Sequence, residues 1–300
     1  NARGNARGNA RGNARGNARG AVDPIWGDVA IKSYDELLAD PEIDAVYIPL
    51  PNHLHVTFAI KALEAGKPVI CEKPVALSLE ELERLRVVAE RSGVYLYDGY
   101  MVRFHPQWQW LKEIDVGERQ QLIAHFSYPP QPQGNIRNIA AWGGGPIWDI
   151  GCYCLLSGLM LFDGVPELQY VIKTPEEALD VEKSAAAIIS FGAAGSKSQI
   201  LNLSCSSGMG LSQSVHLIGS KGWARLDVPF NPPMQTKGRY ALAEDGIDTL
   251  LGLGKEVVFA PCDQYQVMVE DFAMAISEGR KTDLSQSYHL TKILAEMAAS

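Results

Sequence analysis

The chain has 300 residues, of which 46% are hydrophobic and 21% are charged, and this composition is typical of a globular chain of one or two domains. No apolar run approaches the ~20 residues that a membrane-spanning helix needs, so we expect no membrane partner, and we expect no secretory signal. The formal net charge is −8, an acidic balance that argues against nucleic acid as a partner.

The first twenty residues repeat the tetrapeptide Asn-Ala-Arg-Gly five times. A four-residue period matches neither a helix nor a strand, and the repeat offers no large apolar side chain to bury, so we expect residues 1–20 to be disordered. The repeat carries five Arg and no acidic residue, so taking these charges from the total of −8 leaves −13 on the rest of the chain. An Arg/Gly tract could bind RNA weakly, which is the only support for an RNA-associated function.

The cysteines indicate the redox environment of the protein. Their number is odd and none of them has CxxC spacing, which fits reduced thiols in a cytoplasmic protein better than a disulfide framework or a zinc site. The five are Cys71, Cys152, Cys154, Cys205 and Cys262.

Residues 21–99 alternate short apolar runs with amphipathic stretches. We expect strands at residues 44–50, 69–71 and 94–97, and helices that begin at Ser33, run over 56–65 and run over 78–91. Strand and helix alternating at this spacing predict βαβ units, and therefore a parallel sheet with right-handed crossovers.

A lysine follows the strand at the centre of this region. Pro74 stops the strand directly after Glu72 and Lys73 and pushes Lys73 toward an extended conformation. Lys73 would then lie at the carboxyl end of a parallel strand, where open α/β sheets bind their ligands. The alternative is a surface lysine that pairs with Glu72.

Residues 100–300 have a different pattern of predicted secondary structure. Five β-rich runs without intervening helices predict a mainly antiparallel sheet; they are residues 168–172, 184–191, 198–205, 213–219 and 223–228. Two helices are expected to close the chain, at residues 264–277 and 286–299. We therefore expect a parallel α/β domain over 21–99 and an α+β domain over 100–300.

Several motifs, taken together and in order, resemble the Gfo/Idh/MocA family of oxidoreductases, and the resemblance runs from about residue 33 to the end of the chain. The motifs are Asp44–Leu50, Pro51–His55, Ala62–Lys67, Cys71–Pro74, Arg103-Phe104, Gly143–Gly145 and Asp149–Tyr153. Tyr153 and the segment Asn135-Ile136-Arg137-Asn138 point to the branch of the dihydrodiol and xylose dehydrogenases and glucose–fructose oxidoreductase.

The resemblance implies an NAD(P)-dependent oxidoreductase that acts on a sugar or diol, with a Rossmann domain and an α+β domain whose sheet mediates homo-oligomerisation. It implies that Lys73 and Tyr153 line the pocket, and that Pro51, Asn52, His55 and Glu72 border the cofactor, NAD or NADP. Oxidation of a carbinol needs a base, and a nearby ammonium favours the phenolate of a tyrosine with an ordinary pKa near 10. We therefore expect Tyr153 to accept the proton and Lys73 to lower its pKa.

The family's Gly-rich turn is not found in this sequence. Members open with a strand, a G-x-G-x-x-G turn for the pyrophosphate and a helix, whereas no such motif precedes Ser33. We therefore expect an incomplete Rossmann-type sheet, and the sequence does not distinguish NAD from NADP. The alternative function is a truncated, non-catalytic member that serves as a binding or oligomerisation module.

Three further side chains have two interpretations each. Asp149, one helical turn before Tyr153, either bonds a sugar hydroxyl or caps the helix. Arg103 either binds a substrate oxygen or forms a salt bridge. His53 and His55 have the H-x-H spacing of a zinc site, but no further ligand is placed nearby in the sequence, so we expect no metal.

Overall fold

The computed structural model describes residues 32–175, 179–192, 199–247, 251–252 and 254–300. The repeat that we expect to be disordered, residues 1–20, lies outside the described residues. The chain divides into two compact units. The first comprises the chain up to Gly99 together with Val269–Leu284, and the second comprises Tyr100–Met268 together with Ser285–Ser300.

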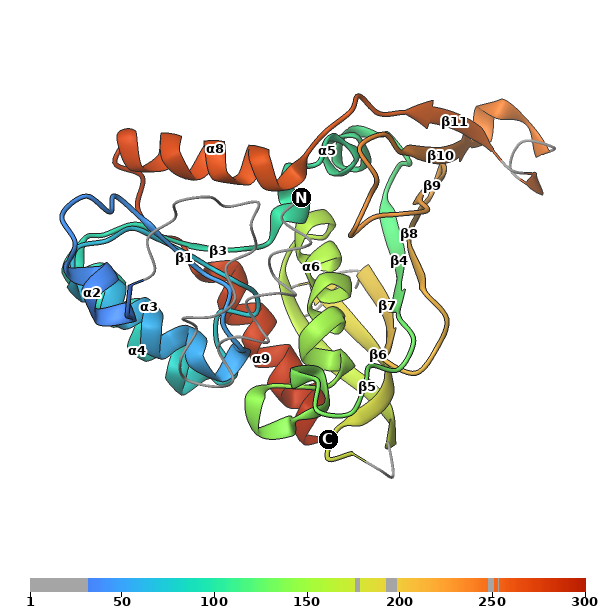
Figure 1. Cartoon of the computed structure of the whole chain (residues 1–300). Coiled ribbons are helices and arrows are strands. Elements are labelled where there is room, and N and C mark those ends of the chain that lie inside the picture. The colour runs from blue at the N-terminus through green and yellow to red at the C-terminus, as the bar shows by residue number, and fades with distance from the viewer. Residues whose placement is uncertain (1–31, 176–178, 193–198, 248–250, 253) are drawn as a thin grey trace. The chain divides into compact units, whose positions relative to one another are not determined.

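The first unit contains a parallel sheet, as the alternation of strands and helices predicts. Its three described strands are β1 (Val46–Ile48), β2 (Val69–Cys71) and β3 (Leu96–Asp98), paired in that order. The helices that precede and connect them are α2 (Tyr34–Ala39), α3 (His55–Glu64) and α4 (Leu79–Ser92) (Figure 1). Side-chain caps set two of the helix starts, because Ser33 accepts a hydrogen bond from the backbone of Glu36 and Ser78 accepts one from that of Glu81.

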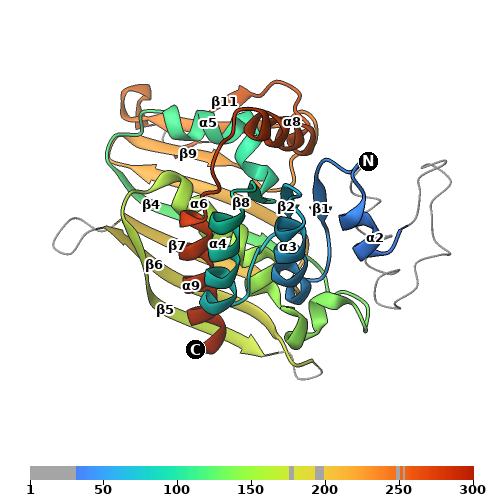
Figure 2. The same ribbon diagram turned by 90° about the vertical axis from the view of Figure 1, so that its left-hand side faces the viewer.

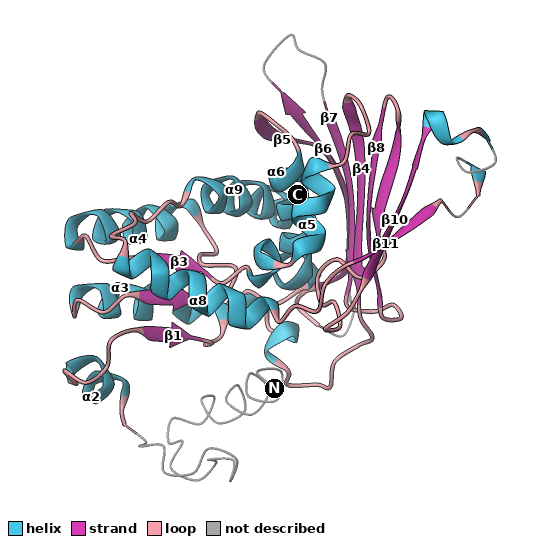
Figure 3. Cartoon of the chain, turned by 90° about the horizontal axis from the view of Figure 1, so that it is seen from above, coloured by secondary structure: helices cyan, strands magenta, loops and turns pink. Residues whose placement is uncertain are grey.

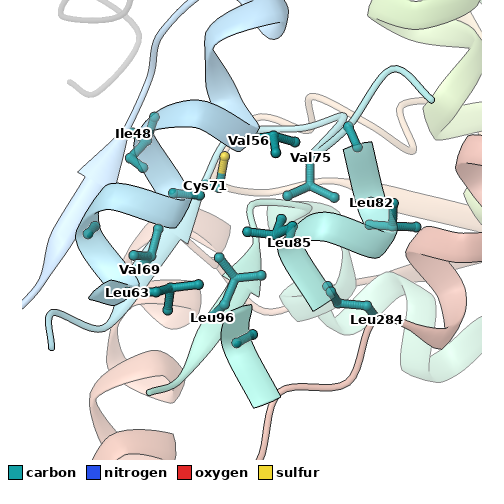
Figure 4. Packing of buried hydrophobic residues seen from close by; sticks show 14 of the residues in the cluster. Ile48, Val56, Leu63, Val69, Cys71, Val75, Leu82, Leu85, Leu96 and Leu284 are labelled. Atoms are coloured by element: carbon teal, nitrogen blue, oxygen red, sulfur yellow. The ribbon is translucent and has the colours of Figure 1, made fainter. Parts of the chain in front are cut away.

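A cluster of buried apolar side chains holds this unit together (Figure 4). Leu63, Leu85 and Leu96 are almost completely buried in it, each coming from a different element. Leu284 joins the same cluster from a distant part of the chain. Burial of each such side chain contributes about 1.5–3 kcal/mol of hydrophobic free energy.

Residues 269–284 therefore fold with the first unit, although the sequence analysis placed them in the second domain. The ring of Phe272 packs against Tyr95 with 5.7 Å between centroids, and the Leu96 backbone N–H donates to Thr282 Oγ1 at 2.9 Å. These contacts join segments almost two hundred residues apart, which helical periodicity alone does not reveal. Most of helix α8 (Gln264–Ser277) belongs to this segment.

The second unit is built on an eight-stranded sheet of order β11-β10-β9-β8-β4-β7-β6-β5. All neighbours pair antiparallel except β4 and β7, which are parallel, so the sheet is mainly antiparallel, as predicted. The strands are β4 (Arg119–Ser127), β5 (Val165–Pro175), β6 (Glu182–Gly192), β7 (Gln199–Ser206), β8 (Ser212–Gly219), β9 (Gly222–Leu226), β10 (Lys237–Leu242) and β11 (Lys255–Val258). The sequence analysis missed β10 and β11.

Helices cover one face of this sheet, and its other face is open (Figures 2 and 3). Two long helices, α6 (Cys152–Leu161) and α9 (Ser285–Ala299), pack on the covered face. The shorter α5 (Pro106–Glu113) lies on the same side of the sheet. Strand β4 follows this division, because Leu122 and Phe126 are buried whereas Ile123 is 40% exposed. No helix of the described residues is long and apolar enough to cross a membrane.

Candidate active site

The carboxyl ends of the three parallel strands form one edge of the sheet in the first unit. The loop after β2 places Glu72 and Lys73 there, both half-buried, and the Lys73–Pro74 peptide bond is cis. Gly99, directly after β3, donates its N–H to the Cys71 carbonyl at 2.6 Å. A Cβ at this position would lie only 3.0 Å from that oxygen, so a glycine is needed for the two loops to approach so closely.

Glu72 is tied to the neighbouring strand. Its carboxylate accepts hydrogen bonds from the Tyr47 hydroxyl and from the Lys73 backbone N–H, the latter at 3.3 Å. These bonds hold the chain just before Lys73 and orient the start of the loop.

His55 links two loops at this edge. Its ring is completely buried, with Nδ1 2.8 Å from the Pro74 carbonyl oxygen and Nε2 2.7 Å from that of Leu50. Burial lowers the pKa of His55 below its usual value, although the two carbonyls favour the protonated form. Both ring nitrogens are directed at backbone carbonyls, and the predicted place of His55 beside the cofactor stays a prediction. Its position therefore suits a residue that fixes the loop carrying Lys73.

This edge fits the nicotinamide end of a dinucleotide. Open parallel sheets bind such ligands outside the carboxyl ends of their strands, and the half-buried Asn52 and Lys73 supply hydrogen-bond donors there. The buried Pro51 precedes Asn52 at the start of a short 3₁₀ turn, Asn52–Leu54. Cofactor contacts of Pro51, Asn52, His55, Glu72 and Lys73 remain predictions. The segment in which we looked for a pyrophosphate loop, before residue 32, lies outside the described part of the chain.

Tyr153 lies in the second unit, in the first turn of α6. A single π-helical turn, Ile147–Gly151, leads into that helix, and such turns occur often at functional sites. The Tyr153 side chain is 6% exposed, and its hydroxyl lies 3.6 Å from the sulfur of Met101. Its ring packs against Tyr100, Phe126 and Phe230 with centroids 5.7–6.0 Å away, so aromatic packing fixes its orientation.

Phe230, which the sequence analysis did not single out, comes from an irregular segment that is anchored by buried amides. Its N–H donates to Gln213 Oε1 at 2.8 Å, and its carbonyl accepts from Gln264 Nε2 at 3.2 Å. The neighbouring Pro229 carbonyl accepts from Gln107 Nε2 at 2.8 Å. Only the fold brings these glutamines together, and no sequence motif signals the arrangement.

Asp149 belongs to the π-helical turn, four residues before Tyr153. Its Oδ2 accepts hydrogen bonds from the Tyr128 hydroxyl at 2.9 Å and from Arg137 Nε at 2.6 Å. Burial, followed by the Asp149 charge, raises the pKa of Tyr128, and the Asp149 charge raises that of Arg137. Glu182 Oε1 on β6 accepts the Ile147 N–H at 3.0 Å, so a residue other than Asp149 bonds this N–H group at the start of the helix. Both interpretations of Asp149, a bond to a sugar hydroxyl and a helix cap, remain predictions.

Arg103 also lies in the second unit. Its Nη2 donates to Gln286 Oε1 at 3.1 Å, and its guanidinium stacks over the Tyr100 ring at 5.1 Å. Since Tyr100 packs on Tyr153, Arg103 is connected to the tyrosine through one ring. Its binding of a substrate oxygen remains a prediction.

Across the ranges that the structure describes, no group of three or more His, Cys, Asp or Glu side chains could hold a metal ion.

A parallel sheet with helical connections in the first unit and a large, mainly antiparallel sheet in the second are typical of a protein with a Rossmann-type domain. Comparison with known proteins identifies the family. Residues 17–100 match the model of the oxidoreductase family with an NAD-binding Rossmann fold, and residues 108–225 match the GFO/IDH/MocA C-terminal domain. The chain belongs to the Gfo/Idh/MocA family of oxidoreductases.

Individual relatives agree with this membership. An uncharacterised oxidoreductase of Rhizobium meliloti is 36% identical over 262 residues, which cover 86% of this chain and 77% of that protein. An NADP(+)-dependent D-xylose 1-dehydrogenase of Haloferax volcanii is 30% identical over 83% of this chain and 75% of its own length. The solved structure of a 3-ketoreductase from Actinomadura kijaniata with NADP and TDP-benzene has a TM-score of 0.79 at 27% identity, covering 90% of this chain and 81% of that one. The xylose dehydrogenase agrees with the predicted branch of the family.

Proposed function

We propose that the protein is an NAD(P)-dependent oxidoreductase that acts on a hydroxyl-bearing carbon of a sugar or diol. The observation that carries the proposal is the placement of Tyr153. This residue lies on α6, one turn after Asp149, and packing against three aromatic rings fixes the orientation of its side chain. Family membership supports the proposal, as do relatives that act on sugars. When the substrate is oxidised to a carbonyl compound, Tyr153 takes the O–H proton of the carbinol. A bound NAD(P)⁺ would supply the acceptor for the hydride from its C–H bond.

The chain's own residues transfer the proton, stabilise the phenolate and bind the substrate and cofactor. Tyr153 accepts the proton as a phenolate and returns it during reduction. Lys73 favours the phenolate and orients the substrate oxygen, since an ammonium stabilises a nearby negative charge. Asp149 and Arg103 bind substrate oxygens, and Pro51, Asn52, His55 and Glu72 border the nicotinamide.

We expect the protein to act as a homodimer or higher homo-oligomer through the open face of its large sheet. This face carries apolar side chains that are unusually exposed, with Ile123 and Ile188 40% exposed and Tyr170 59% exposed. Light scattering coupled to size exclusion tests this expectation, and a wild-type monomer at micromolar concentration would contradict it. The five cysteines form no disulfide with one another in the described part of the chain, which supports a reducing compartment such as the cytoplasm.

The proposal is tested by replacing Tyr153 with Phe and screening turnover on aldoses, nucleotide-linked keto sugars and aromatic dihydrodiols. Loss of a positioned proton acceptor should lower kcat by about 10²–10⁴-fold, while NADH and NADPH binding, followed by fluorescence, changes little. The exposed Tyr34→Phe serves as the matched control. Turnover by Tyr153→Phe within threefold of wild type would remove Tyr153 from this role. A folded wild-type protein that turns over none of these substrates would favour the non-catalytic alternative.

A further inference from the structure

Arg137 is held in place by both its backbone and its side chain. It lies in a 3₁₀ turn, Ile136–Asn138, whose first N–H groups are capped by Asn135, since Asn135 Oδ1 accepts the Arg137 N–H at 3.0 Å. The Arg137 carbonyl accepts the Gly145 N–H at 2.8 Å. The backbone of this residue is therefore fixed on one side by its own turn and on the other by the glycine turn before α6.

The glycine turn before α6, residues 143–145, needs glycine at two of its positions for steric reasons. A Cβ on Gly144 would lie 2.7 Å from the Arg137 carbonyl oxygen and 2.8 Å from the Ile139 backbone. Gly145 has a φ of +94°, and a Cβ there would meet the Glu182 carboxylate at 2.6 Å. These two positions need glycine so that Arg137 and the start of the helix can approach each other closely.

The Arg137 side chain completes a charge pair at the base of α6. Its Nε lies 2.6 Å from Asp149 Oδ2, with 16% of the Asp149 side chain and 42% of the Arg137 side chain exposed. Asp149 raises the pKa of Arg137 most, and the Tyr128 and Tyr153 hydroxyls raise it further. The guanidinium thus lies within electrostatic range of Tyr153 as well as in contact with Asp149, although water screens part of this interaction.

An unpaired Asp149 would hinder the chemistry proposed for Tyr153. The two residues are four positions apart at the start of one helix, so a bare carboxylate would oppose a second negative charge on the tyrosine oxygen. Other titratable groups of this unit lie around this helix start. Tyr100 packs on Tyr153 and Tyr128 bonds Asp149, and both are neutral at pH 7, whereas the Arg103 guanidinium stacks on Tyr100 and Glu182 accepts the Ile147 N–H. Of the charged groups among them, Arg137 is bonded directly to the Asp149 carboxylate.

We propose that Arg137 is a positioning residue for the proton transfer: it holds Asp149 in one orientation and cancels the carboxylate's charge beside Tyr153. This inference rests on the proposed function, in which Tyr153 takes the proton of the substrate hydroxyl. It assigns to the Asn135–Asn138 segment a role in the reaction and explains why that turn is tied to the glycine turn.

The test measures the titration of Tyr153 directly. The ultraviolet absorbance of the phenolate is followed against pH in each variant and in the same variant carrying Tyr153→Phe, and the difference isolates Tyr153. In Arg137→Gln the carboxylate is uncompensated, so the midpoint should move upward by roughly half a pH unit to one unit, less than the full effect of a buried neighbouring charge because the pair is partly exposed. Arg137→Lys should restore most of the wild-type midpoint.

A double variant distinguishes an effect of the Arg137 charge from an effect of a changed structure. If Arg137 acts by cancelling the Asp149 charge, the double variant Arg137→Gln/Asp149→Asn should titrate close to wild type, because no charge is left to cancel. Arg86→Gln serves as the matched control, since Arg86 forms exposed ion pairs with Glu83 and Glu90 in the first unit. Circular dichroism confirms that each variant is folded.

Activity provides an independent comparison. In Arg137→Gln, the pH at which the oxidation rate reaches half its maximum should rise together with the phenolate midpoint, with kcat affected more than KM. An unshifted phenolate midpoint in folded Arg137→Gln, or a double variant that titrates like Arg137→Gln alone, would overturn the inference. Failure of the proposed function gives a different result, namely no turnover by the wild type, while the phenolate titrations can still be compared.

Discussion

His55→Leu tests how strongly a buried imidazole fixes the loop that carries Lys73. Its two nitrogens lie 2.8 Å from the Pro74 carbonyl and 2.7 Å from the Leu50 carbonyl. Because burial lowers the pKa of His55, the ring is neutral at pH 7.5 and has a single N–H. It therefore donates to one of these carbonyls at a time.

The expected loss of stability follows from that single bond. Leaving one buried carbonyl without its donor costs about 1–3 kcal/mol, and leucine fills most of the ring's volume, so the cavity contribution is small. Urea unfolding followed by circular dichroism at pH 7.5 measures the loss. Hydrogen exchange over residues 46–76 localises it. Thr57→Ala, on the exposed side of the same helix, should change stability by less than about 0.5 kcal/mol.

The pH dependence of this loss provides the sharper test. The folded-state pKa is lowered, so acidification below the ordinary value of 6.5 protonates the unfolded chain first and removes stability from the wild type. The Leu variant lacks this effect, and the stability difference between the two proteins should narrow from pH 7.5 to pH 5.5. A difference that widens would mean that the native ring is an imidazolium donating to both carbonyls, and the reasoning above would be refuted.

Three further outcomes are expected elsewhere in the molecule. Burial lowers the pKa of His105 to about 4, so stability should fall between pH 6.5 and about 4, and His105→Asn, which keeps a capping acceptor, should flatten that fall in acid titrations. Glu182→Ala removes the acceptor of the Ile147 N–H and should cost about 0.5–2 kcal/mol in urea unfolding, whereas Glu182→Gln should lose less than half of that. Gly144→Ala should displace the Arg137 turn and lower kcat/KM at least tenfold in steady-state assays, because its Cβ would lie 2.7 Å from a backbone oxygen; unchanged kinetics would show that the turn can shift without harm.

Much of the fold could be predicted from local signals. Ser33, Ser78 and Gly93 mark helix ends at the positions where the structure has them, and apolar runs mark the three parallel strands. Strands β10 and β11 were missed because Lys237–Leu242 and Lys255–Val258 mix charged and apolar residues, and β11, at the edge of the sheet, buries little of its surface. The placement of 269–284 was missed because only its long-range contacts assign it to the first unit.

The candidate site was predictable to a smaller extent. Short motifs that resemble those of the family singled out Lys73, Tyr153 and Asp149, and the roles of these residues stay predictions. The partners of these residues were not predictable, since the bond between Arg137 and Asp149 depends on how the two turns meet. The same is true of Phe230, whose segment is fixed by glutamines from three other parts of the chain.

The parallel pairing of β4 with β7 has a consequence for how the second unit is synthesised and folded. The other neighbours β5-β6-β7 and β8-β9-β10-β11 follow one another in sequence, so they can assemble as two local meanders. Strand β4 joins the meanders, and its partners Ile200 and Leu217 lie far downstream of Gln121 and Leu122. At about 5–20 residues per second, β4 leaves the ribosome several seconds before either partner exists. During that interval both edges of this strand lack their native partners, so Arg119–Ser127 is open to pairing with strands of other nascent chains.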